Sequence, residues 1–83
     1  PFDWPVRDAK VMTAADCDAL IALEPAVVIL GTGPRQVFPP RDVLAAFLTR
    51  RVGVEFMDNA AAARTYNVLL GEGRKVAAAF VLA

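Results

Sequence analysis

The feature that most constrains the fold is a short apolar run, Val27–Gly31, which lies between a proline and a glycine-rich loop. A run of this length that is rich in β-branched residues is typical of a strand buried on both faces. Two further apolar runs, over about 54–58 and 76–82, alternate with segments of helical periodicity. Such alternation indicates parallel βαβ units with right-handed crossovers. We therefore predict an α/β fold, a three-layer sandwich with flanking helices and a mostly parallel (mixed) central sheet, in which an edge strand could run antiparallel.

The first helix is predicted over about 14–24. Thr13 followed by Asp16 resembles a capping box in which aspartate replaces the usual glutamate. Pro25 ends the helix because proline lacks the amide hydrogen that a helix interior needs. Asp16 and Asp18 lie on the side away from the core, and the apolar side consists of Cys17, Leu20 and Ile21.

The second helix is predicted over about 40–51. Pro40 suits its first turn, and Gly53 is expected to end it. The helical period predicts a buried stripe of Leu44, Phe47 and Leu48. The residues left on the solvent side are Arg41, Asp42, Thr49 and Arg50.

The third helix is predicted over about 60–71, because four consecutive alanines begin it. Either Asp58 or Asn59 can cap its N-terminus. Gly71 and Gly73 are expected to close its C-terminus. In the strand before it, Glu55 should point outward or lie at an edge of the sheet.

With 83 residues, the chain is expected to form a single domain over 1–83. Residues 2–6 are predicted to form a short extended piece, and Pro5 favours an edge position for it. The chain starts at Pro1 with no initiator methionine. We therefore expect that the full-length protein has further residues upstream.

The residue types that are missing restrict the chemistry. The chain has no histidine, no serine and one cysteine. Without histidine there is no imidazole base to activate a nucleophile, and a single thiol cannot supply the usual zinc ligands. We therefore predict no metal and no cofactor. These absences argue against an enzyme without excluding one.

Charge and hydropathy restrict the partners and the compartment. The formal net charge is zero, which gives no electrostatic reason to bind nucleic acid. Hydrophobic residues make up 57% of the chain, so an apolar face could remain for a protein partner or a homo-oligomer. No apolar run approaches the roughly 20 residues of a transmembrane segment. A lone cysteine suits a reducing compartment, and we predict a cytoplasmic protein if it is bacterial.

Polar side chains follow the predicted strands at their carboxyl ends, where open α/β sheets usually bind ligands. The Gly31-Thr32-Gly33 turn and Asp58 lie at those ends. Further polar side chains come from the loop after the first strand and from the third helix. The candidate ligand-binding residues are Thr32, Arg35, Gln36, Asp58, Arg64, Thr65 and Asn67.

A dinucleotide-binding interpretation of Gly31-Thr32-Gly33 fails in detail. The position of the third glycine holds Gln36, and the helix begins several residues late, behind two prolines. The glycine-led turn should instead open directly into the helix whose N-terminus meets the pyrophosphate. The glycines are better explained by a sharp turn out of a buried strand.

Arg35 and Arg64 have two competing interpretations. Their planar guanidinium groups could clamp a carboxylate or a phosphate. Alternatively, they could form ion pairs with Asp58 that order the loop without binding anything. Cys17 is predicted to be a small buried hydrophobic residue rather than a reactive thiol.

Three stretches of the chain carry a family resemblance, and the first is Asp3-Trp4-Pro5-Val6. The second is Val28-Ile29-Leu30-Gly31-Thr32-Gly33, together with Arg35-Gln36 and Phe38-Pro39-Pro40. The third is Gly53-Val54-Glu55 and Met57-Asp58, together with Ala63-Arg64-Thr65-Tyr66-Asn67 and Leu69. In this order they resemble a small α/β family of unknown biochemical function that includes mitochondrial complex I assembly factor three and the adipogenesis-associated protein. Seven arginines against two lysines, with sixteen alanines, suggest a bacterial member, for which a cytoplasmic location is expected, whereas a eukaryotic relative would be expected in mitochondria.

The resemblance implies a three-layer fold with a mixed sheet and an additional N-terminal β segment that this chain lacks. It implies no established reaction. The signature polar residues of the family match the same seven candidate ligand-binding residues that were selected at the strand ends. Eukaryotic members are linked to the assembly of a respiratory complex, so a partner related to such a complex is one expectation.

Two functional hypotheses follow. The first is a non-enzymatic protein-interaction or complex-assembly module with a protein partner that is not identified. The second is a small anionic ligand site, which could be catalytic, at the carboxyl ends of the strands. The side chains available there are good at holding an anion or ordering a loop, and this favours binding over catalysis.

Overall fold

The computed structural model describes residues 10 and 12–81. Its sheet consists of β1 (Val27–Gly31), β2 (Gly53–Met57) and β3 (Val76–Phe80), in the order β2-β1-β3. Both outer strands run parallel to β1, which pairs Val27 with Gly53 on one side and with Val76 on the other. The predicted α/β fold is confirmed, and none of the described strands is antiparallel. The extended piece predicted over residues 2–6 lies outside the described residues.

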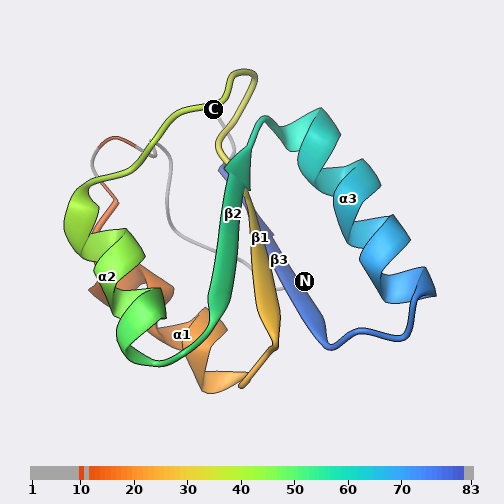
Figure 1. Cartoon of the computed structure of the whole chain (residues 1–83). Coiled ribbons are helices and arrows are strands. Elements are labelled where there is room, and N and C mark those ends of the chain that lie inside the picture. The colour runs from red at the N-terminus through yellow and green to blue at the C-terminus, as the bar shows by residue number, and fades with distance from the viewer. Residues whose placement is uncertain (1–9, 11, 82–83) are drawn as a thin grey trace.

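The helices lie on both faces of this sheet, as Figure 1 shows. Helices α1 (Asp18–Ala22) and α2 (Arg41–Thr49) cover one face, with α1 against β3 and α2 against β2. Helix α3 (Asn59–Gly71) covers the other face. This arrangement follows from the right-handed crossovers, which carry the chain from β1 to β2 over one face and from β2 to β3 over the other.

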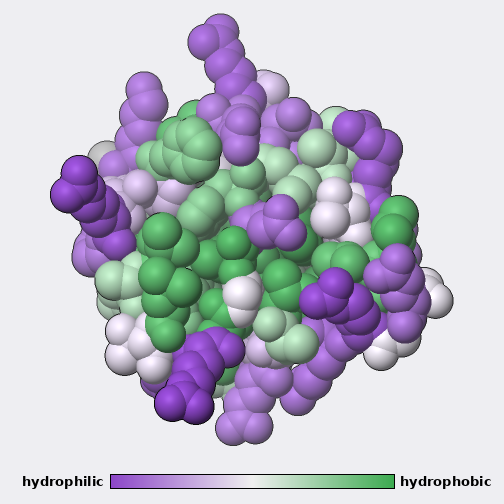
Figure 2. All heavy atoms as spheres, in the orientation of Figure 1, coloured by the Kyte–Doolittle hydropathy of each residue, from purple (hydrophilic) through white to green (hydrophobic). Residues whose placement is uncertain are grey.

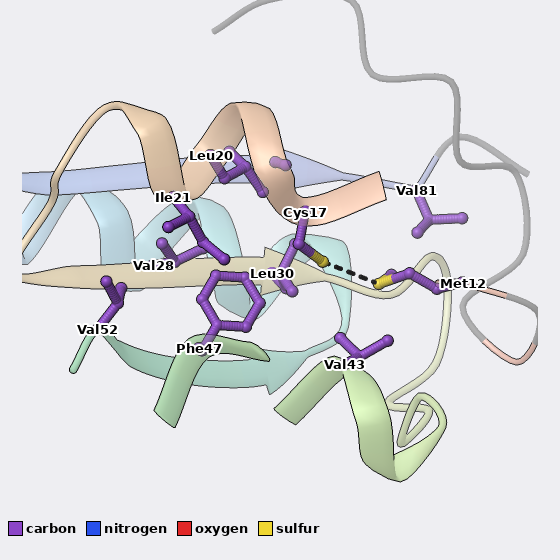
Figure 3. Packing of buried hydrophobic residues seen from close by; sticks show 11 residues of the cluster. Met12, Cys17, Leu20, Ile21, Val28, Leu30, Val43, Phe47, Val52 and Val81 are labelled. Carbon is purple, nitrogen blue, oxygen red and sulfur yellow. Dashed lines mark hydrogen bonds between the residues drawn. The ribbon is translucent and has the colours of Figure 1, made fainter. Parts of the chain in front are cut away.

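Strand β1 is buried along its whole length, as its apolar run predicted. Its alternating side chains enter two separate apolar clusters because successive residues of a strand point to opposite faces. Val28 and Leu30 join the larger cluster beneath α1 and α2, which Figure 3 shows from close by. Val27 and Ile29 pack with Ala62 of α3 in the smaller cluster.

The first helical segment begins as predicted and is shorter than predicted. The Thr13 amide donates to Asp16 Oδ2 at 2.8 Å, and the Asp16 amide donates to Thr13 Oγ1 at 3.3 Å, so the capping box is formed. A 3₁₀ turn (Ala15–Cys17) then leads into α1. The predicted apolar side is confirmed, since Cys17, Leu20 and Ile21 are all buried.

The predicted buried stripe of α2 is partly wrong. Phe47 is buried as predicted, but its partner in the core is Val43, while Leu44 and Leu48 are 41% and 63% exposed. Figure 3 shows Val43 and Phe47 pointing into the cluster. Val43 and Leu44 are consecutive apolar residues, as are Phe47 and Leu48, so two faces about 100° apart satisfy the same helical period. The four residues predicted on the solvent side are all exposed: Arg41, Asp42, Thr49 and Arg50.

The end of α2 also differs from the prediction. Arg51, not Gly53, takes the left-handed conformation that ends the helix, with φ of 58°. The Val52 amide donates to Phe47 O at 2.9 Å and the Arg51 amide donates to Leu48 O at 3.0 Å, which together form a Schellman motif. Gly53 is instead the first residue of β2.

The N-terminus of α3 is capped by Asp58, which settles the choice between Asp58 and Asn59. Asp58 Oδ1 accepts from the Ala61 amide at 2.8 Å. At the other end, Gly73 has φ of 78° and the Arg74 amide donates to Leu69 O at 3.2 Å. Gly73 therefore supplies the left-handed residue that closes α3.

Candidate functional site

Thr32 is the buried polar residue at the carboxyl end of β1. Its amide donates to Met57 O at 2.8 Å, which extends the β1–β2 ladder by one bond. Its hydroxyl lies 2.6 Å from Arg35 O and 3.2 Å from Met57 O, and it accepts from the Val37 amide at 3.0 Å. A hydroxyl has one proton to donate, and here it is directed at a main-chain carbonyl. Thr32 therefore folds the 32–37 loop back onto the strand end.

Asn59, the first residue of α3, joins three segments at the same end of the sheet. Its Oδ1 accepts from the Gly33 amide at 3.0 Å, and its Nδ2 donates to Val81 O at 2.9 Å. Its own amide donates to Gly33 O at 2.8 Å. From the sequence, Asn59 is expected only as a possible cap of α3 and is not among the candidate site residues. The signal available was a short amide side chain at the start of a helix that follows a strand.

Gln36 and Asp58 also use their side chains within the fold. Gln36 Nε2 donates to Phe56 O at 2.9 Å, on the outer side of β2. Asp58 caps α3 through the Ala61 amide. Together with Thr32, these residues lie near the strand ends as predicted, and each contact that they make orders the loop or the helix.

The remaining candidate residues are more dispersed. Arg35, Arg64 and Asn67 are exposed, and Thr65 is half-buried. Arg64 and Asn67 lie five and eight residues into α3 from Asn59, which places them about 7 and 12 Å along the helix axis. Within the described part of the chain, no ion pair joins Arg35 or Arg64 to Asp58. The structure thus brings together Thr32, Gln36 and Asp58, and leaves Arg64 and Asn67 farther along α3.

A cavity of about 290 Å³ lies at the opposite end of the sheet, where α1 and α2 end. It contains none of the candidate residues. The residues that line it are Ile21, Glu24, Pro25, Arg50, Arg51 and Val52. Among residues 10 and 12–81, no group of three or more acidic, cysteine or histidine side chains is placed to hold a metal ion. None of the described helices has the length and apolar character needed to cross a bilayer.

Cys17 is fully buried beneath α1, as predicted. Its thiol contacts Met12 Sδ at 4.0 Å and Thr13 O at 3.7 Å, and Figure 3 shows the sulfur–sulfur contact. Burial raises the pKa of the thiol from its ordinary value of 9.0 to about 11, with smaller contributions from Asp16, Asp18 and Asp42. A thiol held in this protonated form is a poor nucleophile.

This pKa shift predicts a loss of stability at high pH. The folded state holds the thiol proton more tightly than the unfolded state does, so the stabilisation is complete below pH 9 and is lost as the pH rises through about 11. We expect the free energy of unfolding, measured in urea, to fall over this interval more steeply for the wild type than for Cys17→Ala. Equal slopes for the two proteins would contradict the shift.

Comparison with known proteins gives this arrangement a family. The chain is 59% identical to the XCC1710 protein of Xanthomonas campestris, with a TM-score of 0.86 over 95% of this chain and 60% of that one. It is 32% identical to a protein of Bordetella pertussis that is described as a Mth938-like domain, with a TM-score of 0.82 over 95% of this chain and 65% of that one.

A curated relative, the 13 kDa major membrane protein of Francisella tularensis subsp. holarctica, is 30% identical over 71 residues, which are 86% of this chain and 58% of the relative. The chain thus spans less than two thirds of the length of each of these relatives. The family model described as Protein of unknown function (DUF498/DUF598) matches residues 1–81. This chain therefore belongs to the DUF498/DUF598 family.

Proposed function

We propose that this chain is a non-enzymatic protein-interaction module of the complex-assembly type. The observation that carries the proposal is the pair of exposed leucines on α2, Leu44 and Leu48, which are 41% and 63% exposed. Residues four apart lie on the same side of a helix, so the two form one continuous apolar strip. Single exposed leucines are common, but a continuous strip favours a contact with another protein.

The surroundings of the strip support the same proposal. Helix α2 packs against the outer strand β2, whose Val54 and Phe56 are only half-buried. The space-filling view in Figure 2 shows hydrophobic atoms gathered over the middle of the face that carries β2, with hydrophilic atoms around them. An apolar centre with a polar rim is the usual composition of a protein interface.

The strand-end residues give less support to catalysis. Thr32, Gln36 and Asp58 use their side chains in hydrogen bonds to main-chain groups of the fold. The chain also has no histidine or serine anywhere. Groups that are occupied in the folded state would have to release their internal partners before they could act on a substrate.

The experiment compares three tagged proteins in quantitative co-purification from native lysate. These are the wild type, Leu44→Glu/Leu48→Glu, and Ala45→Glu, a matched charge on an exposed position of the same helix. We expect partners that are retained by the wild type and by Ala45→Glu to be lost from the double variant. Unfolding in urea checks that all three are folded. Recovery of the free domain alone, or the same partners with all three proteins, would contradict the proposal.

We further propose that the partner belongs to a respiratory complex and that the protein acts in the cytoplasm. The first part rests on the resemblance to mitochondrial complex I assembly factor three. The Francisella relative, named a major membrane protein, is compatible with a partner complex located at a membrane. The cytoplasmic location rests on the single cysteine, which lies buried and free.

A second candidate function is the binding of a small anion at the strand ends. It is supported by Arg35 and Arg64, which are exposed and have no ion pair among the described residues. Unpaired guanidinium groups keep their donors available for a carboxylate or a phosphate.

Replacing Arg64 with alanine tests this candidate. Because its side chain is exposed and unpaired in the described structure, we expect the free energy of unfolding to change by less than about 0.5 kcal/mol. If an anion binds there, a panel of phosphate and carboxylate compounds should raise the melting temperature of the wild type and not that of Arg64→Ala. A panel without any effect on the wild type would count against an anion site.

A further inference from the structure

The outer edge of β2 carries main-chain groups that the described fold does not use. The Gly53 amide donates to Ala26 O at 3.2 Å and Met57 O accepts from the Thr32 amide, so residues 53, 55 and 57 direct their main-chain groups toward β1. Alternation along a strand directs those of Val54 and Phe56 outward. Gln36 Nε2, which donates to Phe56 O, occupies this outer side. Among residues 10 and 12–81, no strand pairs with it.

Two main-chain groups near this edge are already bonded. Phe56 O accepts from Gln36, and the Val52 amide donates to Phe47 O. The groups that remain without a partner in the described structure are Val54 N–H, Val54 C=O, Phe56 N–H and Val52 C=O. They amount to two donors and two acceptors on one edge, which is what a self-complementary contact requires.

We propose that two copies of this chain associate by antiparallel pairing of their β2 strands, with Val54 of each copy at the two-fold axis. The proposal rests on the interaction role proposed above and adds a second copy of the chain to the protein partners of this module. In this register the two Val54 residues exchange both hydrogen bonds, as a hydrogen-bonded antiparallel pair does. Phe56 N–H of each copy then reaches Val52 C=O of the other. The two groups that are already bonded, Phe56 C=O and Val52 N–H, keep their partners Gln36 and Phe47 O, so each Phe56–Val52 pair forms one hydrogen bond between the copies and not two.

Other registers are less favourable. A two-fold axis at Glu55 would set two exposed carboxylates directly opposite each other, which destabilises a strand pair. An axis at Phe56 would require its carbonyl, which Gln36 already occupies. With the axis at Val54, Glu55 lies opposite Gly53 of the second copy, which has no side chain. The other Glu55 is then only a diagonal neighbour, and Arg50 and Arg51 follow beyond Gly53 with opposite charge.

The apolar strip of α2 adds burial to these hydrogen bonds. A two-fold axis perpendicular to the sheet keeps α2 of both copies on the same face of a continuous sheet, to which each copy contributes its three described strands. Val54 and Phe56 pack toward that same face, with the larger cluster. Leu44 and Leu48 are exposed on α2, which packs against β2, so the second copy can cover them in this arrangement. The chain has no net charge, so two copies do not repel each other over long range.

The experiment measures self-association of the whole chain by analytical ultracentrifugation from about 1 to 500 µM. We expect a reversible monomer–dimer equilibrium for the wild type. Val54→Pro removes an amide that points away from β1, so the parallel ladder should survive while the dimer weakens by about 30-fold or more, since two symmetric hydrogen bonds are lost. Val54→Thr keeps the amide and should still dimerise. Circular dichroism verifies that each variant is folded.

Two further readouts keep the proposal testable if Val54→Pro does not fold. Glu55→Arg should weaken the dimer, and adding Arg50→Glu/Arg51→Glu to it should restore self-association. Amide hydrogen exchange at Val54 should slow as the protein concentration rises. A wild type that stays monomeric at 500 µM, a dimer that neither Val54→Pro nor Glu55→Arg weakens, or protection of Val54 that is independent of concentration would overturn the proposal.

The two proposals fail in different ways. Loss of lysate partners in Leu44→Glu/Leu48→Glu, combined with a monomeric wild type, would reject the β2 dimer and keep the interaction role. A dimer that depends on Val54, combined with an empty co-purification, would keep the dimer and reject a separate protein partner.

Discussion

Replacing Gly31 with alanine is expected to cost about 3–5 kcal/mol of the free energy of unfolding, which is enough to leave a small domain largely unfolded. A Cβ at this position would overlap Asn59 Oδ1 and lie 2.7 Å from Phe80 Cδ1. The Asn59 side chain cannot easily move aside, because it bonds both Gly33 N and Val81 O. Relief of the overlap therefore breaks hydrogen bonds at the junction of β1, β3 and α3.

Unfolding in urea, followed by far-ultraviolet circular dichroism, measures this effect. Gly71→Ala is the matched control, because a Cβ there meets nothing within 4 Å. It should be neutral or stabilising by less than about 1 kcal/mol, since alanine favours helix more than glycine does. The double variant Gly31→Ala/Asn59→Ala should be less destabilised than the sum of its single variants. A Gly31→Ala protein as stable as the wild type would show that the close approach is not as described.

Replacing Phe47 with alanine is expected to destabilise the protein by about 3–5 kcal/mol, because it empties the centre of the larger apolar cluster. Phe47 is fully buried between α2 and the sheet, among the residues drawn in Figure 3. Leu48→Ala, at the next residue of the same helix, should cost less than about 1 kcal/mol, because its side chain is 63% exposed.

The contrast between these two variants tests which face of α2 packs on the sheet. Free energies of unfolding from urea titrations at one pH are compared, together with Val43→Ala, which should resemble Phe47→Ala in direction and be smaller. Similar losses for Leu48→Ala and Phe47→Ala would favour the stripe expected from the sequence alone. Equal stability of Phe47→Ala and the wild type would contradict both arrangements.

The strands and caps were predictable because their signals are local. Val27–Gly31 has no polar residue with which to face water, so it was predicted as a fully buried strand, and the structure buries each of its residues. Thr13 and Asp16 were predicted as a capping box, which is formed, and the cap of α3 was limited to Asp58 or Asn59, of which Asp58 forms it. In each case the two partners are close in the sequence, where spacing alone carries the information.

The face of α2 was not predictable in the same way. Val43 and Leu44 are both apolar, as are Phe47 and Leu48, so the pattern allows two orientations of one helix. The choice depends on how α2 rests on β2 and beside the cluster that β1 and α1 form. Packing of whole elements therefore decided it, and it exposed the strip on which the proposed interaction depends.

Among the candidate site residues, Thr32, Gln36 and Asp58 lie at one end of the sheet as predicted, because parallel strands end on the same side. Whether these residues form a ligand site remains a prediction. The sequence does not indicate which of these polar groups form hydrogen bonds within the fold. Gln36 Nε2 donates to the main-chain carbonyl of Phe56, 20 residues away. Asn59 Oδ1 accepts from the main-chain amide of Gly33, 26 residues away. Pairings over such separations are set by sheet register and by the position of α3.

The sequence by itself determined the order of strands and helices along the chain, a mostly parallel sheet and the absence of histidine and serine, because periodicity, capping and composition are properties of short segments. The tertiary structure alone decided which leucines reach the surface, how Asn59 links the strand ends, and which main-chain groups of β2 remain open. These features depend on the relative placement of segments that are far apart in the chain, and no local pattern records that placement.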